Sequence, residues 1–409
     1  MKGASGLSAR QNSIMERNNL CNEKVELIKK GAVQIFSERG LMERLNSGKK
    51  LKIKFGADPS RPDLHLGHSV PLRKLRLFQD LGHEVIFVIG DFTGMIGDPS
   101  GRSKTRPSLT LEQTRESGET YLKQVTKILI PEKTHIAYNS QWLNKMEFAD
   151  VINLASKYTV ARIMEREDFK NRYAGNQPIG IHELLYPLIQ GYDSVAINAD
   201  VEIGGTDQTF NLLVGRSLQA DFGQKPQEVI TFPLLVGLDG KEKMSKSFDN
   251  YIGVDEPPKI IFEKCMKVPD GILHDYFVLT TDTTEKEASI LISEDIRNAH
   301  FEYAKQIVMM YHGKEAAIGA ENHYREVAGG AVPRHIPVLR INKREITICE
   351  LLKLAGFAGS NNEARRNING KGVKINGTLV ENSELIIKLE EPVVLQFGKN
   401  RFVEVRNEA

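Results

Sequence analysis

The stretch that decides the fold runs from residue 51 to residue 89 and reads LKIKFGADPSRPDLHLGHSVPLRKLRLFQDLGHEVIFVI. Apolar and polar side chains alternate over residues 51–55, as in a β-strand. Apolar residues at helical spacing follow over residues 72–81, and Gly82 ends that pattern. The continuous apolar run at 85–89 is typical of a central parallel strand that is covered on both faces. The stretch therefore predicts a β-α-β unit.

The segment His65-Leu66-Gly67-His68 follows the first predicted strand. In an open parallel sheet this position lies at the carboxyl edge, where ligands bind. Pro71 lacks an N–H group, so we expect the helix to begin between Gly67 and Pro71, with His68 at or beside its N-terminus. Two imidazoles at a helix N-terminus suit a phosphate. The alternatives are surface histidines or metal ligands, and no third ligand is adjacent to favour a metal.

A second motif, Lys243-Met244-Ser245-Lys246-Ser247, follows the last strand predicted for the sheet, at 229–236. An earlier strand is predicted at 199–204. Two lysines on a loop can close over a polyphosphate and neutralise the charge of a leaving group. A solvated basic loop is the alternative for such a motif alone. The presence of both motifs in one α/β chain favours a nucleotide site.

Together the two motifs resemble the signatures of the class I aminoacyl-tRNA synthetases, and within that class the chain is similar to the bacterial-type tyrosyl-tRNA synthetases. The resemblance runs from about Leu51 to the C-terminus. It also rests on GADPS at 56–60, TGMIGDPSG at 93–101, Tyr186 with Gln190 and Asp193, and GGTDQ at 204–208. It implies a tyrosine–tRNA ligase, which forms tyrosyl-adenylate from ATP with release of pyrophosphate and then transfers tyrosine to the tRNA 3′ end.

The resemblance also implies which residues form the site. The catalytic groups that contact the phosphates are His65, His68, Lys243, Lys246 and Arg106. Further ATP contacts are Gly56, Asp58, Ser60, Gly67, Gly205, Asp207, Met244, Ser245 and Ser247. The tyrosine-binding residues are Lys54, Asp98, Tyr186, Gln190, Asp193 and Gln208, with Asp193 on the phenolic hydroxyl. ATP is implied as a substrate with magnesium, and neither a protein metal site nor a permanently bound cofactor is expected.

Three residues depart from the pattern of the family. Lys54 stands where many tyrosyl enzymes carry a second phenol-binding tyrosine, and a lysine there is usual in a second bacterial subfamily. Lys54 could pair with Asp193 or donate to the phenolic oxygen, so its role stays open. Arg102 stands at the position of a frequent loop lysine, and Pro71 where some relatives have threonine. Arg102 and Arg106 are expected near the pyrophosphate, with a solvated loop as the alternative.

The C-terminal part of the chain predicts a small basic module. Ser360-Asn361-Asn362-Glu363 is a capping box for a helix that ends near Gly370, and Asn376-Gly377 indicates a hairpin turn. This pattern resembles the RNA-binding domain shared with a ribosomal small-subunit protein and some pseudouridine synthases. It implies RNA contacts by Arg365, Arg366, Lys371 and Lys374. A solvated charged helix is the alternative.

The expected fold class is α/β, with a Rossmann-like parallel-sheet catalytic domain, a helical domain and a small C-terminal α+β RNA-binding domain. The expected boundaries are an N-terminal tail at 1–30, the catalytic domain at 31–250 with a helical insertion at about 110–187, a helical anticodon-side domain at 251–326, a linker at 327–340 and the C-terminal domain at 341–409. The resemblance implies a homodimer, with the helical insertion as the interface.

Composition limits the class of protein. The chain has 409 residues and a net charge of +2, so an RNA-binding surface must be a local patch. Its three cysteines are an odd number without CxxC spacing. This indicates a reducing compartment and argues against a zinc ribbon. Apolar runs stay short of the roughly 20 residues that cross a bilayer, and residues 1–19 lack a hydrophobic signal core. We therefore expect a cytoplasmic protein.

Three other functions compete with tyrosine charging. A tryptophanyl-tRNA synthetase shares the fold and both motifs, but Gln190 stands where an indole would favour an apolar residue. A non-charging RNA-binding protein on a synthetase scaffold would have no physical need for the histidines and lysines of an ATP site. A small-molecule nucleotidyltransferase also uses HxGH, but it does not explain the helical and RNA-like regions.

Overall fold

The computed structural model describes residues 21–57, 64–98, 124–328, 336–398 and 401–408. The chain forms two compact units. One comprises Met1–Pro257 with Lys264–Ile307, and the other comprises Pro258–Glu263 with Val308–Ala409. Within the described ranges, no helix is both long and apolar enough to span a membrane.

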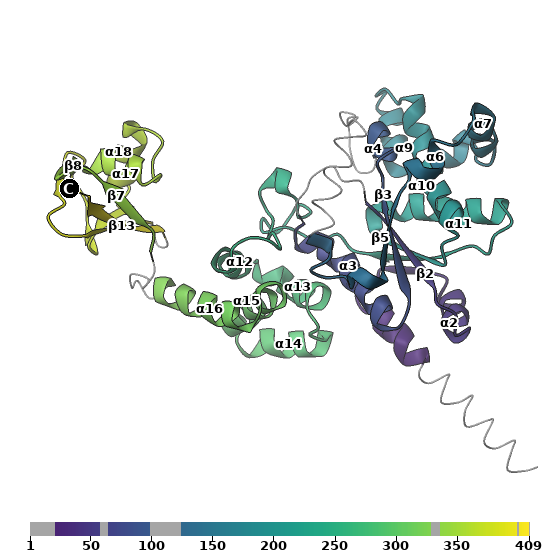
Figure 1. Cartoon of the computed structure of the whole chain (residues 1–409), viewed down its shortest axis with the longest axis horizontal. Coiled ribbons are helices and arrows are strands. Elements are labelled where there is room, and N and C mark those ends of the chain that lie inside the picture. The colour runs from purple at the N-terminus through teal and green to yellow at the C-terminus, as the bar shows by residue number, and fades with distance from the viewer. Residues whose placement is uncertain (1–20, 58–63, 99–123, 329–335, 399–400, 409) are drawn as a thin grey trace, which may run out of the picture. The chain divides into compact units, whose positions relative to one another are not determined.

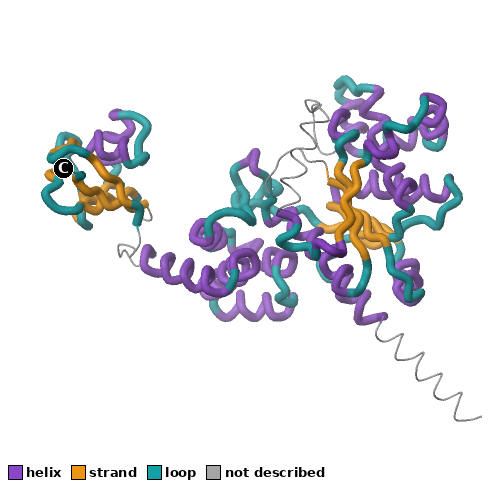
Figure 2. The backbone as a smooth tube through the Cα atoms, viewed as in Figure 1, coloured by secondary structure: helices purple, strands orange, loops and turns teal. Residues whose placement is uncertain are grey.

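A β-sheet forms the centre of the first unit (Figure 2). It has six strands in the order β1-β6-β5-β2-β3-β4. The strands are β1 (Gln34–Phe36), β2 (Lys52–Ala57), β3 (Glu84–Ile89), β4 (Thr134–Tyr138), β5 (Val201–Gly205) and β6 (Glu228–Phe232). All neighbouring pairs are parallel except β1 with β6. The residues predicted for the central strand form β3, whose side chains are largely buried. The predicted Rossmann-like parallel sheet is confirmed.

Helices cover the sheet on two sides, with α3 on one side and α10 and α11 on the other (Figure 1). In addition to a helix at residues 21–29, the helices of this unit are α2 (Glu38–Asn46), α3 (Leu66–Asp80), α4 (Thr93–Ile96), α6 (Ser140–Leu143), α7 (Phe148–Ser156), α8 (Val160–Ile163), α9 (Glu167–Ala174), α10 (Ile181–Ile197), α11 (Thr209–Asp221), α13 (Leu273–Thr280) and α14 (Glu285–Glu294). The helices α12 (Pro258–Cys265) and α15 (Ile296–His312) contribute residues to both units.

The structure differs from the sequence-based expectation at two segments. The insertion at about 110–187 was expected to be mostly helical, yet β4 lies within it as an edge strand parallel to β3. β4 is short and largely accessible to solvent, so it lacks the buried apolar run that identified β3. Residues 21–29 form a helix within the expected tail at 1–30, where Cys21, Val25 and Ile28 are buried.

The start of α3 also differs from the expectation. The helix begins at Leu66 and contains Pro71, whereas a start between Gly67 and Pro71 was expected. Proline removes only its own N–H, so Pro71 cannot donate to the carbonyl of Gly67, and the rest of the helix continues past it. The earlier start makes His65 the N-cap residue.

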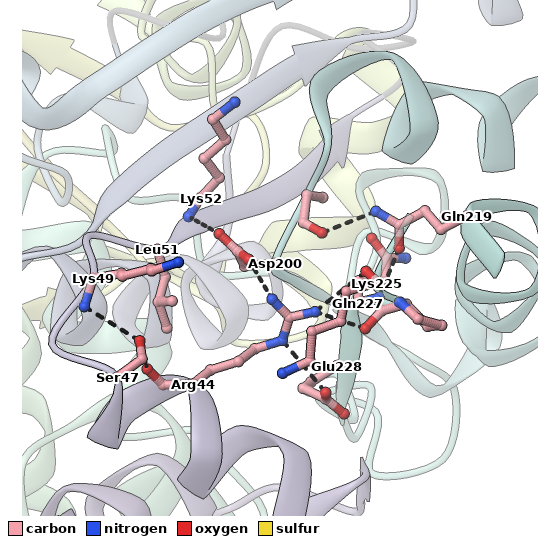
Figure 3. A network of polar contacts seen from close by, with 12 residues as sticks. Arg44, Ser47, Lys49, Leu51, Lys52, Asp200, Gln219, Lys225, Gln227 and Glu228 are labelled. Carbon is pink, nitrogen blue, oxygen red and sulfur yellow. Dashed lines mark hydrogen bonds and ion pairs between the residues drawn. The ribbon is translucent and has the colours of Figure 1, made fainter. Parts of the chain in front are cut away.

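At the amino ends of the parallel strands, the sheet is held by a network of charged side chains centred on Arg44 of α2 (Figure 3). Its guanidinium pairs with Asp200, lies 3.4 Å from Oε1 of Glu228 and donates to the carbonyl of Pro226 at 2.7 Å. Asp200 accepts from the backbone N–H of Lys52 at 3.0 Å. The network therefore joins the starts of β2, β5 and β6 at the edge far from their carboxyl ends.

In the second unit, helix α16 (Lys314–Ala328) precedes a small α+β module. The elements of the module are β7 (Val338–Ile341), β8 (Glu345–Thr347), α17 (Ile348–Leu354), α18 (Asn361–Asn369), β9 (Val373–Ile375), β10 (Thr378–Leu379), β11 (Ile386–Lys388), β12 (Val393–Phe397) and β13 (Arg401–Asn407). The sheet order is β10-β9-β12-β13-β7, with β11 and β8 paired separately. At the ends of the expected linker, 327–340, α16 continues to Ala328 and β7 begins at Val338.

The local signals of this module are confirmed except for one half of the capping box, because the side chain of Glu363 accepts from the N–H of Gly359 and not from that of Ser360. Oγ of Ser360 accepts from the N–H of Glu363 and caps α18, which ends before Gly370. Asn376 and Gly377 both have positive φ, at 48° and 82°, as the hairpin between β9 and β10 requires.

Replacing Arg44 by methionine is expected to lower the free energy of unfolding by about 3 kcal/mol, because Asp200 and the buried Glu228 lose their shared cation. Urea denaturation measures the change. The matched control is Arg39→Met on the same helix, which breaks an exposed ion pair with Glu43 and should cost less than about 1 kcal/mol. Equal losses in the two variants would contradict a stabilising role for the network.

Candidate active site

A cavity of about 360 Å³ is formed by the carboxyl ends of β2, β5 and β6, the start of α3 and the loop that follows β6. The structure brings together around it many of the residues expected to form the site. They are Gly56, His65, Gly67, His68, Asp98, Gln190, Gly205, Asp207, Gln208, Lys243, Met244, Ser245, Lys246 and Ser247. The two motifs, about 180 residues apart in the chain, therefore face one cavity.

The remaining candidate residues fall into three groups. Lys54, Tyr186 and Asp193 are buried beside the cavity and do not line it. Asp58, Ser60, Arg102 and Arg106 lie outside the described residues. The four residues expected to bind RNA, Arg365, Arg366, Lys371 and Lys374, belong to the second unit and are exposed.

The two histidines of HLGH lie at the N-cap and in the first turn of α3 and contact each other, with ring centroids 3.9 Å apart. The backbone N–H of His65 donates to Nδ1 of His68 at 3.3 Å, so a neutral His68 carries its proton on Nε2. Burial, and then the charges of His68 and Lys246, lower the pKa of His65 to about 2. Burial and Lys246 lower the pKa of His68 to about 4. Both imidazoles are therefore neutral at pH 7.

Gly67 allows the two motifs to approach each other closely. A Cβ atom at this position would lie 3.0 Å from ring atoms of His65 and 3.7 Å from Cβ of Met244. A side chain here would have to displace an imidazole whose position is fixed by the start of α3. Crowding by His65 and by Met244 of the KMSKS loop therefore explains why HLGH has a glycine at this position.

The KMSKS loop is held by the side chain of Asn250. Its Oδ1 accepts from the N–H of Ser245 at 2.8 Å, and its Nδ2 donates to the carbonyl of Lys243 at 3.2 Å. The ammonium of Lys243 lies 3.8 Å from Oδ2 of Asp207, and burial raises the pKa of that carboxyl group. The loop therefore presents its two lysines to a cavity that also holds an acidic group.

The cavity wall also carries a chain of hydrogen-bonded amides that ends at Asp98. Nε2 of Gln208 donates to Asp98 at 3.0 Å, and Nδ2 of Asn211 donates to Oε1 of both Gln208 and Gln190 at 3.0 Å. Nη1 of Arg166 in turn donates to Oδ1 of Asn211 at 3.2 Å. Asn211 and Arg166 were not expected from the sequence, because neither belongs to a motif with recognisable spacing.

Asp193 lies on α10 and is only 3% exposed. Its carboxylate accepts from Nε1 of Trp142 at 2.8 Å and from Nδ2 of Asn139 at 3.4 Å. Burial raises its pKa to about 7, against the opposing effects of Lys54 and these donors. Trp142 and Asn139 were also missed, although Trp142 is the only tryptophan of the chain.

The structure shows the partners of the Lys54 ammonium, which the sequence left open. Its ammonium forms an ion pair with Oε1 of Glu202 at 2.8 Å, and it donates to Oγ of Ser194 at 2.8 Å and to the carbonyl of Gln190 at 3.2 Å. Pairing with Asp193 was one of two possibilities for Lys54, and the structure pairs its ammonium with Glu202 instead. Glu202 takes that place because parallel pairing of β2 with β5 sets it opposite Lys54. A role for Lys54 in tyrosine binding stays a prediction.

Known proteins are similar to this chain over most of its length. The family model of the tRNA synthetases class I (W and Y) matches residues 46–328. The chain is 49% identical over 404 residues to the tyrosine–tRNA ligase of Deinococcus radiodurans, covering 96% of this chain and 98% of the relative. It is 50% identical over 397 residues to that of Geobacter sulfurreducens, covering 94% and 98%.

Solved structures share the fold. A C-terminally truncated mitochondrial tyrosyl-tRNA synthetase of Aspergillus nidulans is similar with a TM-score of 0.62 at 22% identity, covering 78% of this chain and 99% of that one. The tyrosyl-tRNA synthetase of Archaeoglobus fulgidus, complexed with L-tyrosine, has a TM-score of 0.59 at 23% identity, covering 74% and 99%. These likenesses concern the fold alone.

The lowered pKa of His68 predicts how stability depends on pH. Between its ordinary value of 6.5 and about 4, the unfolded chain binds a proton that the folded chain does not, so the unfolding free energy falls as pH falls. From pH 7 to pH 5, the wild type should lose about 2 kcal/mol more than His68→Gln in urea denaturation. Parallel losses in the two proteins would contradict a neutral His68 in the folded protein.

Proposed function

Because the chain belongs to the tRNA synthetases class I (W and Y), we propose that it catalyses the ATP-dependent attachment of tyrosine to tRNA, as the names of its relatives state for those proteins. One observation carries this proposal. The histidines of HLGH and the lysines of KMSKS, which together are called the phosphate end below, line the same cavity as Asp98 and Gln208, and these two residues are joined by a hydrogen bond.

The first step needs no nucleophilic side chain. The carboxylate oxygen of tyrosine attacks the α-phosphorus of ATP, and the bond to the leaving pyrophosphate breaks, so the protein has to position the reactants and stabilise charge. Neutral His65 and His68 can donate hydrogen bonds to phosphate oxygens. Lys243 and Lys246 neutralise the negative charge that accumulates on the pyrophosphate. In the second step a ribose hydroxyl oxygen at the tRNA 3′ end attacks the carbonyl carbon of the tyrosyl-adenylate, the bond from that carbon to the phosphate oxygen breaks, and AMP leaves.

Tyrosine fits, by its chemistry, the part of the cavity that Asp98, Gln190 and Gln208 line. We propose that Asp98, Tyr186 and Gln190 hold the ammonium group, and that Gln208 lies near the carboxylate. Asp193 would receive the phenolic hydroxyl, and Trp142 fixes its orientation by donating to the other side of the carboxylate. Gln190 places a polar amide on the cavity wall, where an indole would favour an apolar residue. This favours tyrosine over tryptophan.

Magnesium would enter with the nucleotide. Mg²⁺ is usually bound through substrate phosphates and one or two carboxylates rather than by a protein cage. The phosphate end of the cavity carries Asp207 beside Lys243, and this acidic group suits such partial coordination. When bound, the ion would neutralise phosphate charge alongside the lysines. The order of events stated above depends only on residues of the chain.

We propose that the C-terminal module contacts tRNA. Arg366, Lys371 and Lys374 are exposed near the end of α18 and along β9. Arg365 instead donates to Glu384 at 3.0 Å, which gives it a partner within the module. Contacts of this kind go to phosphates and to the shape of the RNA more than to bases. Arg366, Lys371 and Lys374 are therefore the stronger candidates.

We also propose a homodimer formed through the helical insertion. Large apolar side chains are exposed in this segment, including Phe148 at 81%, Tyr173 at 72% and Ile181 at 80%. Such a concentration of exposed apolar surface is typical of an interface.

A reducing, cytoplasmic location is supported by the three cysteines, which are all buried and unpaired.

Replacing Asp193 by alanine should lower the preference for tyrosine over phenylalanine at least tenfold, because the hydroxyl loses a hydrogen bond to a buried carboxylate. The ratio of activation efficiencies in ATP–pyrophosphate exchange measures this, with a panel of other amino acids to test the substrate class. The matched control is the exposed Asp221→Ala at the end of α11. A ratio that stays constant would refute the phenol assignment.

Replacing Arg366, Lys371 and Lys374 together by glutamine should raise the KM for tRNA about tenfold or more and leave ATP–pyrophosphate exchange within twofold. The reason is that phosphate contacts are lost from the second unit, whereas the cavity belongs to the first, and the salt dependence of tRNA binding should weaken by about one unit of slope per contact. Lys343, Lys353 and Lys388 changed to glutamine remove the same charge elsewhere in the module. Matching effects of the two triple variants would contradict a defined RNA surface.

A further inference from the structure

The segment at residues 250–256 joins the two motifs of the site. The N–H of Leu66 donates to the carbonyl of Ile252 at 3.0 Å, and the N–H of Val254 donates to the carbonyl of Leu64 at 3.1 Å. His65 and Gly253 form an antiparallel bridge between them. Tyr251, the first residue before this pairing, therefore lies between HLGH and KMSKS.

The ammonium groups of two lysines lie over the ring of Tyr251. Nζ of Lys264 is 4.2 Å from the ring centroid, and Nζ of Lys246 is 5.3 Å from it. The ring of His65 lies on the same side of the site, with its centroid 6.4 Å away. Lys264 is fixed to the frame, because it also donates to Glu256 at 2.6 Å and to the carbonyl of Tyr251 at 3.0 Å. Lys246, by contrast, is carried by the motif loop.

We propose that Tyr251 is a positioning residue, whose ring holds the ammonium of Lys246 beside His65 and His68. The proposal rests on the function proposed above and extends it. A cation over the face of a tyrosine ring is attracted by the electrons of that face. Without the ring, the long side chain of Lys246 would regain rotamer freedom that must be lost again for each turnover.

An aromatic ring suits this task better than a carboxylate would. A carboxylate close to Lys246 would hold it by a strong ion pair and would repel the phosphates of ATP. The ring carries no net charge, so Lys246 can move onto the pyrophosphate when that group develops negative charge. His65 and His68 sense the same ammonium, since Lys246 contributes to the lowered pKa of both. The position of Lys246 thus affects the whole phosphate end of the cavity.

The first experiment compares Tyr251→Leu and Tyr251→Phe in the full-length protein by ATP–pyrophosphate exchange. Tyr251→Leu should lower kcat about tenfold with the KM for tyrosine within twofold, because only the charge on the leaving group loses its partner. Tyr251→Phe retains the ring and should recover most of kcat. The matched control is Phe222→Leu, which also removes a ring beneath a lysine, Lys157 at 5.8 Å, outside the cavity. Equal losses in Tyr251→Leu and Tyr251→Phe would overturn the proposal.

The second experiment tests whether Tyr251 acts through Lys246. In a Lys246→Met background, Tyr251→Leu should cause no further loss of kcat, since the cation that the ring positions is gone. A full additional tenfold loss would show that Tyr251 acts through His65 or the backbone, and would overturn the proposal. If Tyr251→Leu fails to fold, Tyr251→Met supplies the same test. A normal kcat in Lys246→Met alone would instead contradict the function proposed for the site, and the two failures are therefore distinguishable.

Discussion

The site depends on one constraint, the backbone pairing of the segment before α3 with the segment after the KMSKS loop. The hydrogen bonds of Leu66 with Ile252 and of Val254 with Leu64 fix the two motifs relative to each other. The parallel sheet brings the ends of its strands to one edge, but a loop of free length could still turn away from it. Because main-chain atoms make this pairing, it does not depend on the identity of the side chains it joins. The catalytic side chains can then be chosen for their chemistry.

That chemistry is cationic without charged histidines. Lys246 lies near enough to disfavour a proton on His65 and on His68, and burial acts in the same direction. If either imidazole were protonated, the phosphate end would bind pyrophosphate more tightly and release it more slowly. Neutral imidazoles offer directed donors, and the lysines supply the charge from a loop. The division between fixed donors and loop-borne charge suits a reaction whose negative charge moves from one phosphate group to another.

Much of this arrangement could be predicted from the sequence, and the omissions have a common cause. The β-α-β unit, the capped helix α18 and the Asn376-Gly377 hairpin follow from local periodicity and turn chemistry, and the motifs indicated the edge of the sheet where they meet. Arg166, Asn211 and Trp142 were missed because each meets its partner only after the helices pack. The edge strand β4 was missed because half-exposed strands lack the apolar run of a central one. Local signals predicted the elements and motif residues, and tertiary contacts determined the supporting residues.

Lys54 shows how such supporting contacts bear on specificity. An ammonium has three N–H groups, and Lys54 finds three acceptors within the protein, on β5 and at two points of α10. It can donate to a phenolic oxygen only by giving up one of these, which would leave a buried polar group less well paired. The contacts to Ser194 and to the carbonyl of Gln190 also tie Lys54 to the turn of α10 that carries Asp193. A lysine at this position therefore fixes the helix that carries Asp193, and its positive charge offsets part of the effect of burial, which raises the pKa of Asp193.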